Sequence, residues 1–168
     1  MTRGPPSRAR LRTAVVVVVA SLAGLGAAQL VPIRVTNSNA RIEPRWDSPQ
    51  TRQLVVVACF DCHSNQSRHV WYEELAPIKW WIAGHVDGGR SALNFDAWNR
   101  PQEGARRAGP SLSEGQMPPS YYTWFGLHAD ARLTAVQVKA LVSGLDRTIA
   151  NDPPPSGPAG AGDAQGGP

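Results

Sequence analysis

Apolar positions divide the 168-residue chain into one long continuous run and several shorter periodic runs. The long run extends from Thr13 to Ile33, and after Thr13 only Ser21 and Gln29 are polar. As a helix, this segment would be about 31 Å long, close to the thickness of the hydrocarbon core of a bilayer. Because a helix in a globular core rarely lacks a polar face, we expect residues 13–33 to form a transmembrane anchor.

The shorter runs predict a mainly α domain. Ser48-Pro49 is typical of a helix start, and the apolar residues that follow lead into a pair of cysteines. A second helix is expected over about residues 76–88, and a short third helix over residues 96–107. The last helix should begin near Thr134, because apolar side chains recur at helical spacing after it. No segment has the alternation of a strand-turn-strand pair.

Composition divides the chain into five segments. They are a basic segment (1–12), the anchor (13–33), a linker (34–45), a folded domain (46–150) and a tail (151–168). The tail is almost entirely Pro, Gly, Ala and Ser, which offer too little apolar surface to offset the entropy of ordering them. We therefore expect the tail to be disordered.

The excess of basic residues belongs to the N-terminal segment. The formal net charge is +4, but Arg3, Arg8, Arg10 and Arg12 all precede the apolar run. Without these four of the 17 basic residues, the chain has equal numbers of basic and acidic residues. A nucleic-acid partner is therefore not expected.

The same arginines predict how the anchor is oriented. They place the N-terminus in the cytoplasm, so a single span leaves the folded domain on the periplasmic or extracellular side of the cell membrane. A cleaved signal peptide is the alternative, because Gly26-Ala27-Ala28 offers small residues before a cut ahead of Gln29. Residues 30–33 extend the apolar run beyond that cut, which favours an anchor. Both readings export the folded domain.

The two cysteines carry the candidate chemistry. They lie in the sequence Cys59-Phe60-Asp61-Cys62-His63, and C-x-x-C-H is the attachment signature of c-type haem. Residues three apart on a helical turn face the same side, so both thiols can reach the two vinyl groups of one porphyrin. His63 can then present an imidazole nitrogen to the iron, and Pro77 is a candidate for the backbone carbonyl that accepts its other N–H. We expect one covalently attached haem c.

Three other readings of the cysteine pair remain. A redox dithiol also uses C-x-x-C and suits an exported protein, but the surrounding sequence has no β-α-β alternation. A structural zinc site needs four ligands, and His69 or His85 would have to replace a missing second cysteine pair. A structural disulfide across two residues would close a small, strained loop.

Met117 is the candidate for the second axial ligand of the iron. It lies in Gly115-Gln116-Met117-Pro118-Pro119, where two prolines would stiffen the loop. A thioether suits haem iron and favours its ferrous state, although a methionine can also simply fill a gap in a core. His85, on the second expected helix, is the rival ligand. His69 and His128 are expected to have surface or structural roles.

Several short motifs surround the cysteines. In chain order they are Trp46–Pro49, Ala58–Asn65, Trp71-Tyr72, Ala76–Ile78, Gly89-Arg90, Leu93–Phe95 with Trp98, Gly115–Pro119 and His128–Thr134. With these motifs the chain resembles the haem-binding domain family, small exported proteins with one C-x-x-C-H site, over about residues 46–145.

The resemblance implies that haem attaches at Cys59 and Cys62, that His63 binds the iron, and that Met117 occupies the family's Met-Pro loop. We therefore expect a small cytochrome c-like helical domain wrapped around one covalent haem. Relatives usually have a continuous helix before the Met-Pro loop, whereas residues 107–111 are expected to interrupt it here.

The function that we expect is one-electron transfer between unidentified redox protein partners, with no enzymatic activity. If His63 and Met117 fill both axial positions, no site remains open for oxygen or peroxide. A haem-based sensor or ligand-binding module is the alternative, and it would need Met117 to leave the iron. A peroxidase-like enzyme would also need a distal acid–base residue, such as His85 or Glu114.

Overall fold

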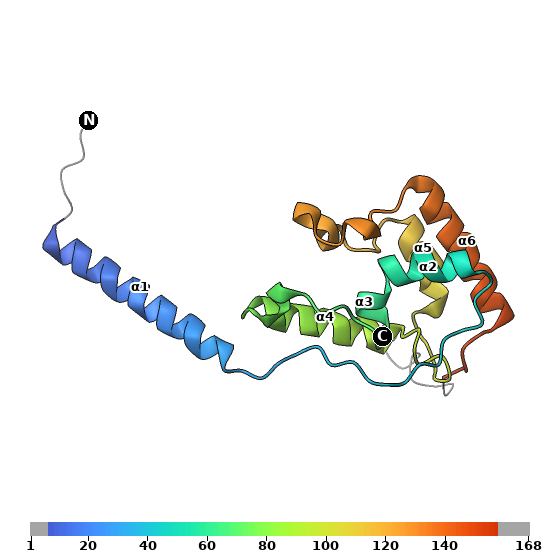
Figure 1. Ribbon diagram of the computed structural model, residues 1–168, viewed down its shortest axis with the longest axis horizontal. Coiled ribbons are helices and arrows are strands. Elements are labelled where there is room, and N and C mark those ends of the chain that lie inside the picture. Colours follow the sequence, from blue (N-terminus) through green and yellow to red (C-terminus); the bar gives the residue numbers. More distant parts are fainter. Residues whose placement is uncertain (1–6, 158–168) are drawn as a thin grey trace, which may run out of the picture. The chain divides into compact units, whose positions relative to one another are not determined.

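The computed structural model describes residues 7–157 and is mainly helical, as the sequence predicts (Figure 1). The elements in chain order are α1 (Arg8–Gln29), α2 (Pro49–Ala58), α3 (Phe60–His63), η1 (Trp71–Glu74), α4 (Ile78–Ala92), η2 (Ala105–Arg107), α5 (Ala108–Ser113), η3 (Ser120–Gly126), η4 (Ala129–Ala131) and α6 (Ala135–Asn151), where η marks a 3₁₀ helix. Within residues 7–157 the only β pairing is an isolated bridge between Ile42 and Ala97.

The chain forms two compact units. Among the described residues, the first contains residues 7–34 together with His69–Ala83, and the second contains Val35–Arg68 and residues 84–157. Residues 35–45, expected as a linker, thus belong to the second unit. Residues 69–83, expected within the folded domain, cluster with α1 instead. Helix α4 begins in the first unit and ends in the second.

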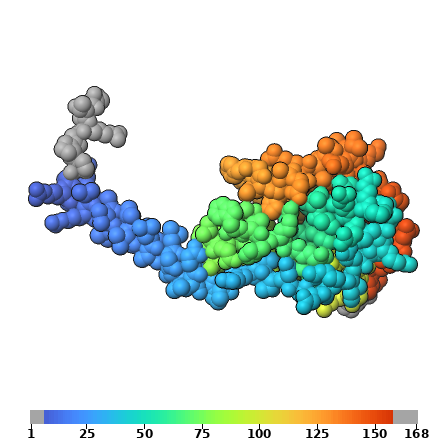
Figure 2. All heavy atoms as spheres, in the orientation of Figure 1, coloured from blue at the N-terminus to red at the C-terminus, as the bar shows by residue number. Residues whose placement is uncertain are grey.

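In the first unit, α1 has the properties expected of a membrane span. It is 22 residues long, has apolar side chains on all sides and buries none of its residues. Figure 2 shows the helix in blue, with side chains projecting from it. It begins earlier than the expected residue 13, because Ser7 caps its first turn by accepting from the Arg10 N–H. It ends at Gln29 rather than at residue 33, since Pro32 cannot supply the N–H that a longer helix needs.

In the second unit, capping residues determine where α2 and α6 begin. The Ser48 side chain accepts from the Thr51 N–H at the start of α2, and Pro49 is the first helical residue. Thr134 and Gln137 form a reciprocal capping box at the start of α6. Both predicted starts are confirmed.

A continuous apolar core joins α2, α5 and α6 to the segment after α4. Its buried residues are Leu54, Val55, Phe60, Leu93, Phe95, Trp98, Ala105, Leu112, Leu141 and Leu145. The Phe95 ring packs against Phe60, Trp98 and Trp46 with centroid separations of 6.1, 6.0 and 5.4 Å. This core lies directly beneath the cysteine motif, because Phe60 belongs to both.

The third predicted helix, over residues 96–107, is wrong. Its first residues use their backbone groups in tertiary pairing: the Ile42 N–H donates to the Asp96 carbonyl, and the Trp98 N–H donates to the Ile42 carbonyl. The Asp96 carboxylate is fully buried and accepts from the Asn65 N–H at 2.8 Å. Backbone groups engaged in this way are not available to a helix, and only η2 forms.

The expected interruption before the Met-Pro loop is also wrong. Gly109 and Pro110 lie in the first turn of α5, where a proline is tolerated because its missing N–H would have no helical partner. The segment therefore starts a helix rather than breaking one.

Asp152, the residue that caps the C-terminal end of α6, is hydrogen-bonded to other parts of the second unit. The Asp152 side chain accepts from the Arg45 N–H at 2.7 Å, and its carbonyl accepts from Trp98 Nε1 at 2.8 Å. Residues 158–168 of the expected disordered tail lie outside the described residues.

Gly144 offers a test of how closely α2 and α6 pack. A Cβ at this position would lie 2.1 Å from Thr51 Oγ1, and Thr51 is buried. Gly144→Ala should therefore force the helices apart and lower the free energy of unfolding by about 1–3 kcal/mol, measured by chemical denaturation. Gly84→Ala is the control, since nothing lies within 4 Å of its Cβ. Equal stability of the two variants would contradict this packing.

Candidate functional site

The cysteine motif forms one tight helical turn, in which Cys59 caps the end of α2 and the next four residues, Phe60–His63, are α3. The Cys59 N–H donates to the Val55 carbonyl, and the Cys59 carbonyl accepts from the N–H groups of both Cys62 (3.1 Å) and His63 (2.9 Å). Cys59, Cys62 and His63 therefore share the turn that the sequence predicts. Both cysteines are partly buried and neither forms a disulfide.

The surroundings of the thiols favour their neutral form. Burial, with a smaller contribution from Cys62, raises the pKa of Cys59 to about 12. Burial and the neighbouring Asp61 carboxylate raise the pKa of Cys62 to about 11. A reactive dithiol needs a lowered thiol pKa, so this environment argues against the redox-dithiol reading. Nor do residues 7–157 contain a group of three or more His, Cys, Asp or Glu side chains placed to hold a metal ion, as a structural zinc site would require.

The His63 ring is held by a hydrogen bond to the backbone of Leu93. Its Nδ1 atom lies 2.9 Å from the Leu93 carbonyl oxygen, and because a carbonyl can only accept, Nδ1 carries the proton. This tautomer leaves the Nε2 lone pair available to a metal. Burial lowers the pKa of His63, which also favours the neutral ring. The backbone carbonyl that accepts from His63 is therefore that of Leu93, and the prediction that Pro77 supplies it is wrong.

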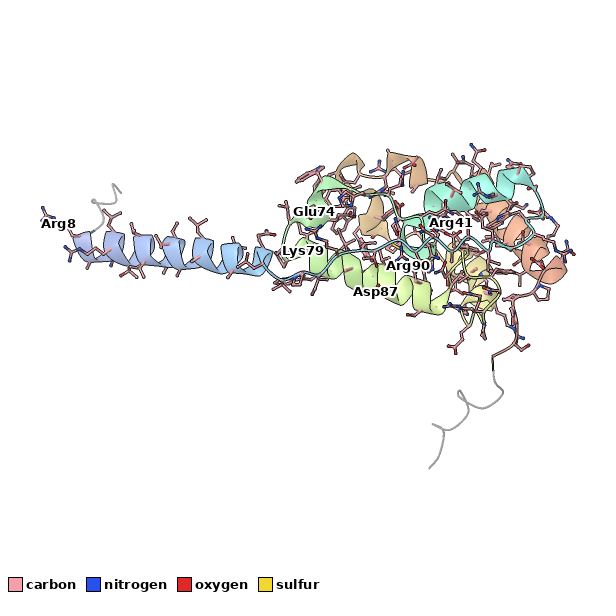
Figure 3. The ribbon with its side chains drawn as sticks, turned by 60° about the horizontal axis from the view of Figure 1, so that its bottom comes forward. Arg8, Arg41, Glu74, Lys79, Asp87 and Arg90 are labelled. Atoms are coloured by element: carbon pink, nitrogen blue, oxygen red, sulfur yellow. The ribbon has the colours of Figure 1, made fainter. Side chains whose placement is uncertain are left out.

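Residues at the end of α4 clamp the turn. A Cβ at Gly89 would lie only 2.4 Å from the Cys62 carbonyl oxygen, so the backbone of α4 approaches the turn as closely as glycine allows. Arg90, labelled in Figure 3, donates from Nε to the Ser64 carbonyl at 2.8 Å. The Phe95 N–H donates to the His63 carbonyl at 2.8 Å. Together these contacts fix the position of the turn.

Met117 lies on the loop between α5 and η3. The N–H groups of Gln116 and Met117 both donate to the Ser111 carbonyl, and Gly115 has a φ of 69°, so the chain turns sharply after α5. The Met117 side chain is 41% exposed, which does not fit the reading of a core methionine. Its role as the distal ligand stays a prediction.

The other histidines divide into two kinds. His85 packs edge-on against Tyr121, with ring centroids 5.7 Å apart, and so lies beside the segment that follows the Met-Pro loop. His69 pairs with Glu73 and Glu74, and His128 stacks on Tyr122 at 4.0 Å. The expected structural roles of His69 and His128 agree with these contacts, and His85 remains the rival ligand.

A polar network that the sequence did not reveal joins the cysteine turn to η3 and η4. The Tyr122 hydroxyl donates to Asp61, which lies between the two cysteines, and Arg68 Nε donates to Asp61 Oδ2 at 3.0 Å. Arg68 also pairs with Asp130 at 2.8 Å and lies 3.1 Å from His128 Nδ1. Arg68 follows Asp61 closely in the sequence, but nothing there signals that Tyr122 is a partner.

The residues of the turn fit a covalently held haem. Two neutral thiols three residues apart can each form a thioether, and the adjacent imidazole offers Nε2 while its other nitrogen is fixed. Trp124 and Phe125, which follow the Met-Pro loop, are exposed.

Two adjacent glycines allow the clamp to be tested with a matched control. Gly89→Ala should displace the Cys62 backbone, lower the free energy of unfolding by about 1–3 kcal/mol and reduce the haem bound per chain. Gly88→Ala should leave both nearly unchanged, because nothing lies within 4 Å of its Cβ. Denaturation curves and the haem-to-protein absorbance ratio measure these effects. Equal haem content in both variants would show that the clamp is not needed for haem uptake.

Comparisons with known proteins identify the family. No curated protein and no solved structure matches the chain. A family model described as the haem-binding domain matches residues 23–147, which include the C-x-x-C-H turn, the end of α4 that clamps it and the Met-Pro loop. The match covers well over half of the sequence, and the chain belongs to the haem-binding domain family.

Proposed function

We propose that this protein carries one haem c and transfers single electrons while α1 holds it in the membrane. The observation that carries the proposal is the turn on which two free thiols stand beside an imidazole whose Nδ1 is held by the Leu93 carbonyl. When bound, haem would supply an iron that gains and loses one electron. Cys59 and Cys62 would each add a thiol across one vinyl group, the sulfur bonding to one carbon and the proton passing to the other.

His63 would bind the iron through Nε2. The hydrogen bond from Nδ1 to the Leu93 carbonyl selects the required tautomer and fixes the ring plane. It also makes the Nε2 lone pair a stronger ligand for iron. Because burial lowers the pKa of His63, the ring is neutral at pH 7 and can act as a ligand without first losing a proton.

Met117 would be the second axial ligand, and this assignment makes the protein a carrier rather than an enzyme. A thioether favours ferrous iron, and an iron with two side-chain ligands has no open position for a substrate. The support is the sharp turn after α5 and the exposure of the Met117 side chain, which has no core role.

A haem-based sensor is the second candidate. The observation that favours it is the contact between His85 and Tyr121, which places a second side chain able to bind iron, besides Met117, beside the segment that follows the Met-Pro loop. In a sensor, Met117 would leave the iron when a gaseous ligand binds.

Covalent attachment can be tested by extraction. Protein matured in an exporting host should keep its haem colour on the denatured chain after acid–organic extraction, because thioether bonds survive this treatment. Cys59→Ser combined with Cys62→Ser should lose the colour. Complete loss of haem from the unaltered protein would refute covalent attachment.

Met117 can be tested by spectroscopy and redox titration. Met117→Ala should remove the weak far-red absorption band of methionine-ligated ferric haem, lower the reduction potential and allow carbon monoxide to bind the ferrous iron. His85→Ala is the control and should leave all three properties nearly unchanged.

Two results would overturn the assignment of Met117. If His85→Ala opened the iron and Met117→Ala had no effect, the ligands would be two histidines. If the unaltered protein bound carbon monoxide readily, the distal position would be open and the sensor would replace the carrier.

A further inference from the structure

A short segment of the first unit is fastened to the C-terminal end of α1. The Lys79 ammonium donates to the Gln29 carbonyl at 2.9 Å, and the Ala76 N–H donates to the Gln29 side chain at 3.2 Å. Arg34 and Glu74 add a weaker ion pair at 3.9 Å. Figure 3 shows Glu74 and Lys79 beside this end of the helix, with Arg8 at the other end. The segment therefore lies at the level where α1 ends.

The Lys79 contact has a clear physical basis. Carbonyls at the C-terminal end of a helix lack helical partners and carry partial negative charge, which an ammonium group stabilises. Lys79 is only 7% exposed, so its charge is kept next to Gln29 rather than in bulk water. This contact holds residues 71–79 to the end of α1.

The same segment exposes apolar side chains. Trp71 is 73% exposed, Leu75 42% and Ile78 43%. Tyr72 packs edge-on against Trp71 at 5.7 Å. Trp and Tyr are enriched where a membrane meets water, because their rings are amphipathic. Arg34, which pairs with Glu74 of the same segment, is a basic residue of the kind that also suits this zone.

We infer that residues 71–78 form an interfacial segment, with Trp71, Leu75 and Ile78 inserted among the lipid headgroups beside α1. This inference rests on the proposal that α1 spans the membrane. The apolar surface of α1 ends near Gln29, and the exposed side chains of the segment are fastened to that residue. A lipid surface is therefore the occupant that lies at the right level.

Nitroxide labels on the full-length haem protein test the inference in vesicles of phosphatidylethanolamine and phosphatidylglycerol. Trp71→Cys and Ile78→Cys place a label on the segment, Val18→Cys places one in the middle of α1, and Val136→Cys places one on exposed α6. Collision with oxygen reports depth in lipid, and collision with a water-soluble nickel complex reports exposure to water. Two positions on the segment are labelled so that the test still works if one variant misfolds. An unchanged haem spectrum verifies that each variant is folded.

The segment labels should be several-fold less accessible to the nickel complex than the Val136 label, and less accessible to oxygen than the Val18 label. If they matched the Val136 label while the Val18 label lay in hydrocarbon, the interfacial segment would be wrong and the anchor would stand. Labels shielded from both reagents would show that protein or haem covers the segment, which also overturns the inference. A Val18 label in water would refute the anchor itself.

Discussion

The close approach of α4 to the cysteine turn is the contact on which the candidate site depends. Because Gly89 has no side chain, the backbone of α4 can pack directly against the Cys62 carbonyl. This close packing places the Leu93 carbonyl, just after α4, next to His63 Nδ1. Arg90 and Phe95 then bind the carbonyls of Ser64 and His63. A larger residue at position 89 would displace all of these partners together, because they lie on one short stretch of chain.

The features that sequence predicted well are local. The caps at Ser48 and Thr134 involve side chains three residues from their partners, and the cysteine turn needs only the spacing of its own residues. The third helix failed because Ile42, far away in the sequence, takes the backbone groups of Asp96 and Trp98. Local propensity contains no information on such competition.

The partners of the site residues were harder to predict for the same reason. Every residue has a backbone carbonyl, so the amino-acid sequence does not indicate that Leu93 rather than Pro77 accepts a hydrogen bond from His63. Tyr122 reaches Asp61 across sixty-one positions of sequence, and only the path of the chain through the Met-Pro loop brings them together. The chemistry of a motif can be predicted from its residues, whereas its supporting contacts depend on tertiary structure.

Peptide mass spectrometry can test the proposed attachment of one haem through Cys59 and Cys62. Trypsin should release residues 53–68 as one peptide, because Arg52 precedes it, Arg68 is its last residue and no other lysine or arginine lies between them. From the mature protein, this peptide should carry the mass of one haem and neither of its cysteines should react with an alkylating reagent. A peptide that lacks the mass of haem and has both cysteines alkylated would refute covalent attachment.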